Sequence, residues 1–217
     1  MARASDQPGR AERTRKTMID IARRRQRPGS GSNLRELMKR TPPMNWPDLR
    51  AALAGIPWAV AGAVATRSYM PERATRRLDI VTSPGDVPEV ARKLESAGYE
   101  RQRELAIGGS AWRSPDGVPV DVIECNEPWC PAAVAEAATT LDVQGYPVLP
   151  LAYLALMKMQ SSRLVDVGDL GRMLGLADET SLARVRQTFA QYAPGLTDDL
   201  ESMIALGKLE TEGEPPA

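Results

Sequence analysis

The fold of this chain depends on the stretch from Pro57 to Ser83, whose sequence is PWAVAGAVATRSYMPERATRRLDIVTS. Its apolar beginning predicts a strand over Trp58–Ala61, and Gly62 then starts a short helix that ends near Tyr69. A turn that contains proline follows, and a second apolar strand is predicted over Leu78–Val81. The stretch therefore predicts two strands joined by one short helix.

Two features of this unit are typical of a phosphate and metal site. Gly62 leads the helix, and glycine lets backbone N–H groups approach a phosphate. Asp79 lies in the second strand, and a carboxylate can hold a divalent cation. Farther along the chain, Asp121 lies in an alternating strand, Val118–Ile123, after the hairpin signal Ser-Pro-Asp-Gly that begins at Ser114. If the two strands are neighbours, both carboxylates reach one edge of the sheet.

The remaining pattern predicts an α+β fold, in which a mixed sheet with flanking helices is followed by a helical second half. The first half adds a helix over 87–97 and a strand over 101–107. The chain beyond Cys130 has the periodicity of helices over 131–139, 150–160, 166–174, 180–192 and 197–209. We therefore expect a flexible basic arm at 1–32, an α/β core at 33–130, a helical region at 131–210 and a disordered tail at 211–217.

Charge is distributed unevenly along a chain whose formal net charge is zero. The first 50 residues contain 13 Lys and Arg against 5 Asp and Glu. Within this region, 11–25 has the pattern of a basic helix. A basic arm of this kind suits contact with tRNA or another RNA, or with an acidic partner, and it is equally typical of a solvated chain end.

Composition excludes several classes of site. The chain has no histidine, which excludes Ser-His-Asp and Cys-His triads and the usual zinc ligands. Cys125 and Cys130 do not have the spacing of a metal-binding pair, so we expect reduced thiols in a reducing compartment. No apolar run has the roughly 20 residues of a membrane span, and no signal region follows the charged N-terminus. These features favour a cytoplasmic protein without a membrane partner.

Three stretches together resemble the nucleotidyltransferase superfamily with the DNA polymerase β-like fold. The first is Gly62-Ala63 at a helix start, followed by Arg-Ala-Thr-Arg-Arg-Leu-Asp-Ile-Val from Arg73 to Val81. The second is Asp121 at the place of the family's third acidic residue, and the third is a lysine helix followed by Arg and spaced Asp within 149–170. The resemblance extends over about residues 56–176. Within the superfamily, these stretches are most similar to those of abortive-infection type toxins and minimal bacterial nucleotidyltransferases.

The resemblance implies transfer of a nucleotide from a nucleoside triphosphate, assisted by Mg²⁺ or Mn²⁺. In that family pattern Asp79 and Asp121 would be metal ligands, and together with Lys158 they would be the catalytic residues. The residues that would bind the nucleotide are Gly62, Ala63, Arg73, Thr75, Arg77, Arg163 and Asp166. A nucleoside triphosphate, an RNA and a cognate antitoxin are the partners that the resemblance suggests.

The chain departs from the family pattern at Arg77, where a strand aspartate is expected. A guanidinium in place of a carboxylate repels a divalent cation, and a unit charge about 4 Å away is worth roughly 4 kcal/mol at an effective dielectric of 20. Three alternatives stay open: a single metal at Asp79 and Asp121, a phosphate bound by Arg77 in place of a metal, or a domain that has lost catalysis. The function is accordingly either nucleotide transfer to an RNA, protein or small molecule, or binding by a catalytically degenerate module.

Overall fold

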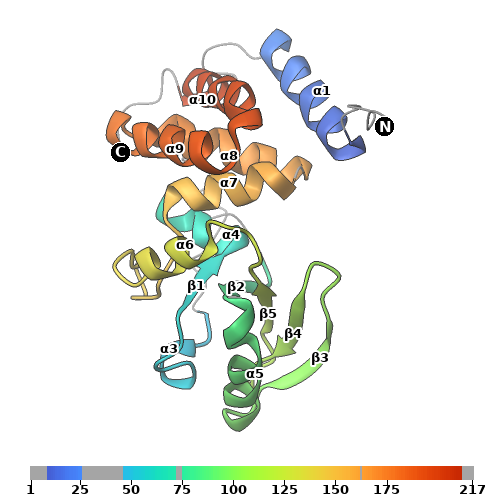
Figure 1. Ribbon diagram of the computed structural model, residues 1–217, viewed down its shortest axis with the longest axis vertical. Helices are drawn as coiled ribbons and strands as arrows, with labels where there is room; N and C mark the ends of the chain where they lie inside the picture. The colour runs from blue at the N-terminus through green and yellow to red at the C-terminus, as the bar shows by residue number, and fades with distance from the viewer. Residues whose placement is uncertain (1–8, 26–45, 72–74, 162, 212–217) are drawn as a thin grey trace, which may run out of the picture. The chain divides into compact units, whose positions relative to one another are not determined.

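The structure is a computed structural model that describes residues 9–25, 46–71, 75–161 and 163–211 (Figure 1). It divides into two compact units. The sheet unit comprises the described residues of Asn33–Leu154, and the helical unit those of Met1–Ser32 and Ala155–Ala217. The expected boundary after Cys130 therefore moves to Leu154, inside helix α7 (Leu151–Ser161), because the chain over 131–154 makes its contacts with the sheet unit.

A mixed sheet of five strands forms the centre of the sheet unit, in the order β1-β2-β5-β4-β3. Strands β2 and β5 are parallel, and the other neighbouring pairs are antiparallel. The bounds are β1 Trp58–Ala61, β2 Leu78–Thr82, β3 Glu100–Glu104, β4 Gly109–Arg113 and β5 Pro119–Glu124. The α+β prediction is confirmed, and β1 and β2 lie where the apolar runs placed them.

Strand β3 is shorter than the sequence pattern indicated. It begins at Glu100 and ends at Glu104, because the chain turns at Leu105, whose carbonyl accepts the N–H of Gly108 at 3.1 Å. All five residues of β3 are exposed, and four of them are charged. Since β3 is the last strand in the sheet order, its charges protect an open edge from pairing with another chain.

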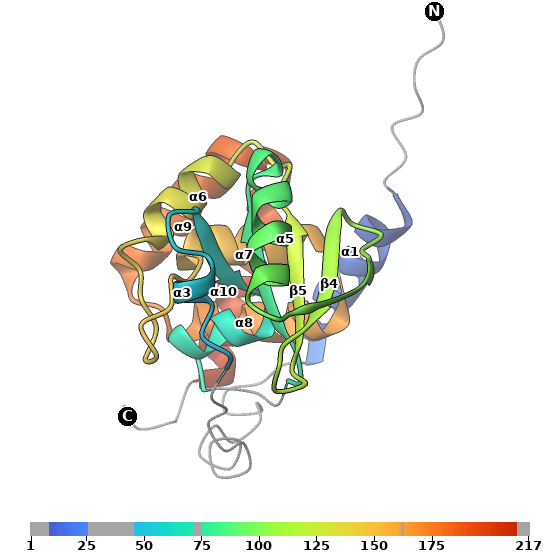
Figure 2. The same cartoon turned by 90° about the horizontal axis from the view of Figure 1, so that it is seen from below.

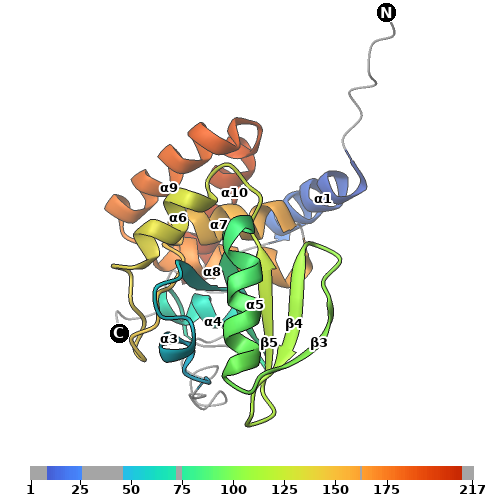
Figure 3. The same cartoon turned by 60° about the horizontal axis from the view of Figure 1, so that its bottom comes forward.

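In the described part of this unit, several helices accompany the sheet. They are α3 (Leu49–Ala52), α4 (Gly62–Ala65), α5 (Val87–Ser96) and α6 (Cys130–Ala137), and α4 continues into a 3₁₀ turn over Thr66–Ser68. Helix α5 lies across one face of the sheet (Figures 2 and 3), and its apolar residues Val90 and Leu94 are fully buried. Burial of this apolar stripe, with helical spacing in the sequence, is the main reason why α5 forms.

The helical unit contains α1 (Arg10–Arg25), α8 (Leu164–Leu176), α9 (Glu179–Tyr192) and α10 (Thr197–Thr211), together with most of α7. Helices α8 and α10 approach closely at glycines. A Cβ atom added to Gly207 would lie 2.0 Å from the carbonyl oxygen of Gly171 and 2.7 Å from the backbone nitrogen of Gly175. The two backbones are therefore in direct contact at this point. Thr211, which we expected in the tail, is the last residue of α10, and 212–217 lie outside the described residues.

The expected flexible arm contains an ordered helix. Within 1–32 the described residues form α1, which packs on α10. Its Ile19 is buried, and Nε of Arg15 donates to Asp199 Oδ2 at 2.8 Å with the Arg15 side chain 6% exposed. The basic helix predicted over 11–25 is thus present as α1, and Arg15 of this basic stretch finds a partner in α10. Residues 1–8 and 26–32 lie outside the described part of the chain.

The two cysteines are joined, contrary to the expectation of reduced thiols. Cys125 and Cys130 form a disulfide with their Cα atoms 5.9 Å apart, which is an ordinary separation for such a bond. The chain turns after β5, where the Cys130 N–H donates to the carbonyl of Glu127 at 3.0 Å, and this turn brings the start of α6 back to Cys125. The spacing of five residues gave no sign of this turn.

In the described ranges we find no helix with the length and apolar character needed to cross a lipid bilayer.

Candidate functional site

Asp79 and Asp121 are directly paired in the register of β2 and β5. Because directly paired residues on neighbouring strands share a face of the sheet, their carboxylates lie side by side. The Asp79 side chain is 13% exposed and that of Asp121 is 8% exposed. The structure thus brings together two acidic residues that are far apart in the sequence, as the strand pattern predicted.

Arg77 lies between these two carboxylates. Its Nε donates to Asp79 Oδ1 at 2.8 Å, and its Nη1 is 3.0 Å from Asp121 Oδ2. Since Arg77 precedes Asp79 by two residues in an extended segment, both side chains lie on the same face. The Arg77 side chain is 43% exposed, whereas the two carboxylates are nearly buried, so Arg77 lies on the solvent side of the pair. The sequence led us to expect Arg77 in place of a metal-binding aspartate, and in the structure Arg77 is the partner of both acids.

Gly62 supports the other side of Asp79. Its φ of +61° is in the left-handed region, and a Cβ atom added there would lie 2.1 Å from Asp79 Oδ2. Only a residue without a side chain leaves room for this carboxylate, which explains why Gly62 separates β1 from α4. The next residue, Ala63, is buried and its carbonyl accepts the hydroxyl of Thr66 at 2.7 Å. The phosphate contact proposed for Gly62 and Ala63 stays a prediction.

Arg73 and Thr75 are the two remaining predicted nucleotide-binding residues that precede β2. Arg73 lies outside the described residues. The Thr75 hydroxyl donates to the carbonyl oxygen of Arg77 at 3.4 Å, which is a long hydrogen bond. Thr75 therefore contacts the backbone of the residue that bridges the two acids.

The acidic pair does not fit a divalent cation in this arrangement. A Mg²⁺ site needs several oxygen ligands at about 2.0–2.1 Å. In the part of the chain that the structure describes, no three Asp, Glu, Cys or His residues come together as a metal-binding group. The carboxylates of Asp79 and Asp121 are both bonded to Arg77. The expected metal site is thus replaced by an ion-pair cluster, because a fixed cation already lies between the two ligands.

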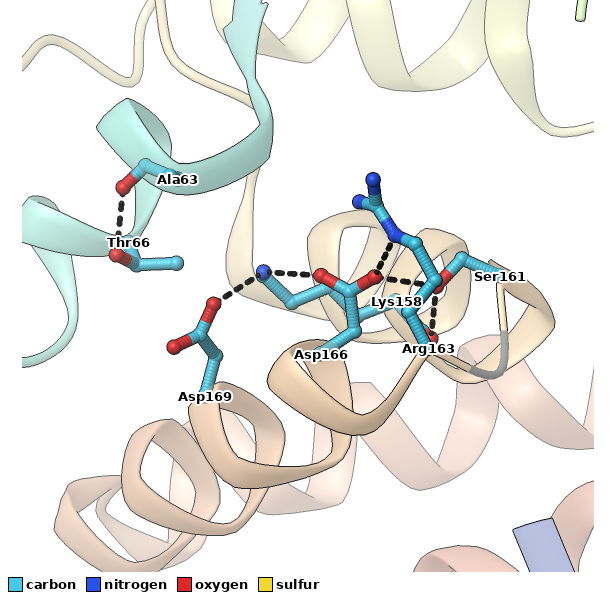
Figure 4. Close-up of polar contacts among 7 residues, drawn as sticks. All are labelled: Ala63, Thr66, Lys158, Ser161, Arg163, Asp166 and Asp169. Atoms are coloured by element: carbon cyan, nitrogen blue, oxygen red, sulfur yellow. Dashed lines mark hydrogen bonds and ion pairs between the residues drawn. The ribbon is translucent and has the colours of Figure 1, made fainter. Parts of the chain in front are cut away.

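Lys158 belongs to a second charged cluster, which lies within the helical unit. Figure 4 shows its ammonium group between two carboxylates of α8, with Nζ 2.9 Å from Asp166 Oδ1 and 2.7 Å from Asp169 Oδ2. Lys158, Asp166 and Asp169 are all buried. The apolar helix around Lys158 indicated that its charge needs a partner, and the structure shows two.

Asp166 is the centre of this second cluster. Its Oδ2 also accepts the Ser161 hydroxyl and Nε of Arg163, each at 2.6 Å. Burial alone would raise the pKa of Asp166, but the bonds from Arg163 and Ser161 and the charge of Lys158 outweigh it, so the pKa lies below its ordinary value. Asp169 is the second of the spaced Asp residues in the stretch 149–170, and its spacing of three from Asp166 places both on one helix face.

A mostly apolar hollow of about 440 Å³ lies elsewhere in the sheet unit, with Trp58, Val134 and Leu141 in its wall. Its lining includes neither Asp79 nor Asp121. The candidate site is therefore the carboxylate pair with its arginine and not this hollow.

The comparisons with known proteins give structural likeness alone. No protein-family model matches the chain, and no curated protein matches it. The solution structure of the antibiotic-resistance factor ANT(2'')-Ia is 14% identical, with a TM-score of 0.45, and the match covers 74% of this chain and 87% of that one.

Two further structures are those of a poly(U) polymerase and a terminal uridylyl transferase. The Cid1 poly(U) polymerase is 11% identical with a TM-score of 0.29, over 76% of this chain and 54% of that chain. Terminal uridylyl transferase 4 from Trypanosoma brucei, solved with bound GTP, is 12% identical with a TM-score of 0.31, over 93% of this chain and 70% of that chain. At these values the likeness assigns no activity to this chain.

Proposed function

We propose that this chain is a nucleotidyltransferase-like protein that binds a nucleoside triphosphate at the site formed by Gly62, Arg77, Asp79 and Asp121. The observation that carries the proposal is the ion-pair cluster itself, in which one guanidinium joins two carboxylates at 2.8 and 3.0 Å. With this cation in place, the geometry favours nucleotide binding over metal-dependent transfer. The proposed site is thus that of a catalytically degenerate module.

Arg77 is the group that would contact the phosphates. An arginine has five N–H donors, and the bonds to the two acids use Nε and Nη1. The donors of Nη2 are the ones that we assign to a phosphate oxygen, because guanidinium–phosphate bonds are charge-assisted and strong. The two carboxylates would fix the direction of the guanidinium and so reduce the entropy that binding costs.

Calorimetric titration of the full chain with each nucleoside triphosphate in the presence of EDTA tests this proposal. We expect at least one triphosphate to bind, and Arg77→Gln to weaken its affinity about tenfold or more, since a bond to a charged group is worth about 1.5–3 kcal/mol. Arg76→Gln removes the same charge from the exposed neighbouring residue and should change the affinity much less. If no triphosphate binds to the wild-type protein, the proposal is wrong.

Nucleotide transfer is the second candidate function, and the register of Asp79 with Asp121 favours it. Its acceptor would be an RNA, a protein or a small molecule, and the exposed Arg24 and Arg25 of α1 are candidates for an RNA contact. Incubation with labelled triphosphates, Mg²⁺ or Mn²⁺ and total tRNA would show it as labelled product that disappears in Asp79→Asn. No labelled product with any triphosphate, together with measurable binding, supports the binding module.

A more specific version of the transfer proposal is that the chain is a toxin with a cognate antitoxin. Growth arrest on expression, relieved by Asp79→Asn or by a co-expressed neighbouring gene product, would support it.

A further inference from the structure

The side-by-side placement of Asp79 and Asp121 creates a charge problem that the fold must solve. Both side chains are almost fully withdrawn from water, and they are neighbours on parallel strands. Two ionised carboxylates in this position repel one another and lose hydration, so the site needs a positive charge even without a ligand.

Arg77 supplies this charge from within the chain. One guanidinium spans the two strands, because separate nitrogens contact the two acids, Nε on Asp79 and Nη1 on Asp121. A guanidinium is the most basic side-chain group of proteins, so Arg77 serves as a fixed cation at this position.

The same oxygens would be needed by a divalent cation. A divalent cation held by both acids would compete with Arg77, which already pairs with Asp79 Oδ1 and Asp121 Oδ2. The guanidinium would have to leave first, and its charge would repel the approaching ion.

Gly62 limits the alternative of turning Asp79 toward a metal elsewhere. The carboxylate lies between Arg77 on one side and the backbone of Gly62 on the other, where even a Cβ atom would lie 2.1 Å from Oδ2. Asp79 is therefore held in the orientation that faces Arg77.

We propose that Arg77 is the resident cation of this site and takes the place of a divalent metal, so that the wild-type pair selects against Mg²⁺ and Mn²⁺. The assignment depends only on these three side chains and Gly62. Its consequence for the ligand, that a triphosphate binds without metal, rests in addition on the proposed function.

A titration of the full chain with Mn²⁺, followed by electron paramagnetic resonance, tests the assignment. We expect no saturable site in the wild type and a gain in Mn²⁺ affinity of about tenfold or more in Arg77→Gln, because the competing charge is gone. Arg76→Gln is the matched control and should behave as the wild type. The double variant Arg77→Gln with Asp121→Asn should lose the gained affinity.

Thermal unfolding gives a second readout that does not involve activity. Mn²⁺ should raise the melting temperature of Arg77→Gln and leave that of the wild type unchanged, because only the variant offers a site to the ion. Arg77→Met, which keeps an unbranched side chain without a charge, is a further variant for the case that Arg77→Gln does not fold. It also removes the competing charge, so it should likewise bind Mn²⁺ more tightly than the wild type.

Two results would overturn the assignment. The first is a saturable Mn²⁺ site in the wild type that Asp121→Asn removes, and the second is equal Mn²⁺ affinity in the wild type and in the folded Arg77 variants. A separate result would contradict the proposed function, namely that no triphosphate binds to the wild type in EDTA. In that case the comparison of Mn²⁺ affinities would still decide the role of Arg77.

Discussion

At the scale of single residues, Gly62 shows how one position controls the candidate site. It combines a left-handed backbone with a place where any side chain would meet the Asp79 carboxylate. The sequence left open whether this glycine contacts phosphate or serves packing. The structure adds a third role, because Gly62 leaves the space that Asp79 occupies.

We predict that Gly62→Ala destabilises the protein and separates Asp79 from Arg77. The left-handed backbone costs an alanine about 1–2 kcal/mol, and the clash with Asp79 adds about 1–3 kcal/mol of overpacking. Denaturant unfolding measures the sum, and triphosphate affinity reports the displaced carboxylate.

Gly55→Ala is the matched control for this variant. Its φ of +80° is also left-handed, but nothing lies within 4 Å of an added Cβ atom. It should show the backbone cost alone, with triphosphate affinity unchanged. Equal losses of stability in the two variants would contradict the role that we give to Asp79 at this contact.

At the scale of elements, the contact between α8 and α10 depends on glycine. A Cβ atom on Gly207 would meet backbone atoms of Gly171 and Gly175, which cannot rotate away as a flexible side chain can. The two helices must move apart to accept any larger residue. Helix pattern alone predicted both helices but gave no indication of how closely they approach.

We predict that Gly207→Ala lowers the free energy of unfolding by about 1–3 kcal/mol, as overpacking does. Gly168→Ala, in the same helix pair, meets nothing within 4 Å and should instead stabilise the chain by about 0.4–1 kcal/mol. Chemical denaturation of the two variants measures both effects. The packing argument would not survive a finding that Gly207→Ala is as stable as Gly168→Ala.

At the scale of the whole molecule, the helical unit is built from both ends of the chain. Helix α1 packs on α10, although almost the whole sequence separates them. Ile19 and the ion pair of Arg15 with Asp199 make this contact. The N-terminal segment is therefore a structural part of the C-terminal unit.

We predict that Ile19→Ala destabilises the helical unit by about 2–5 kcal/mol, the usual cost of emptying a buried isoleucine site. Hydrogen exchange should then accelerate in α10 and stay unchanged in β2 and β5, which belong to the other unit. Ile21→Ala, on the exposed side of the same helix, should leave both unaffected. Equal exchange in the two variants would show that α1 does not support α10.

The sequence by itself determined the elements and their order. Apolar runs placed β1 and β2, alternation placed β5, and helical periodicity placed α5 and the later helices, because these patterns depend on residues that are neighbours in the chain. It also placed Asp79 and Asp121 each in a strand, and predicted that both carboxylates reach one edge of the sheet if these strands are neighbours.

Only the tertiary structure decided what each charged side chain contacts. The register of β2 with β5 brought Arg77 onto both acids, and the turn after β5 joined Cys125 to Cys130. The packing of α1 on α10 brings Arg15 to Asp199. The packing of α7 against α8 brings Lys158 to two carboxylates, those of Asp166 and Asp169. Such contacts depend on distances between residues remote in the sequence, which local periodicity does not encode.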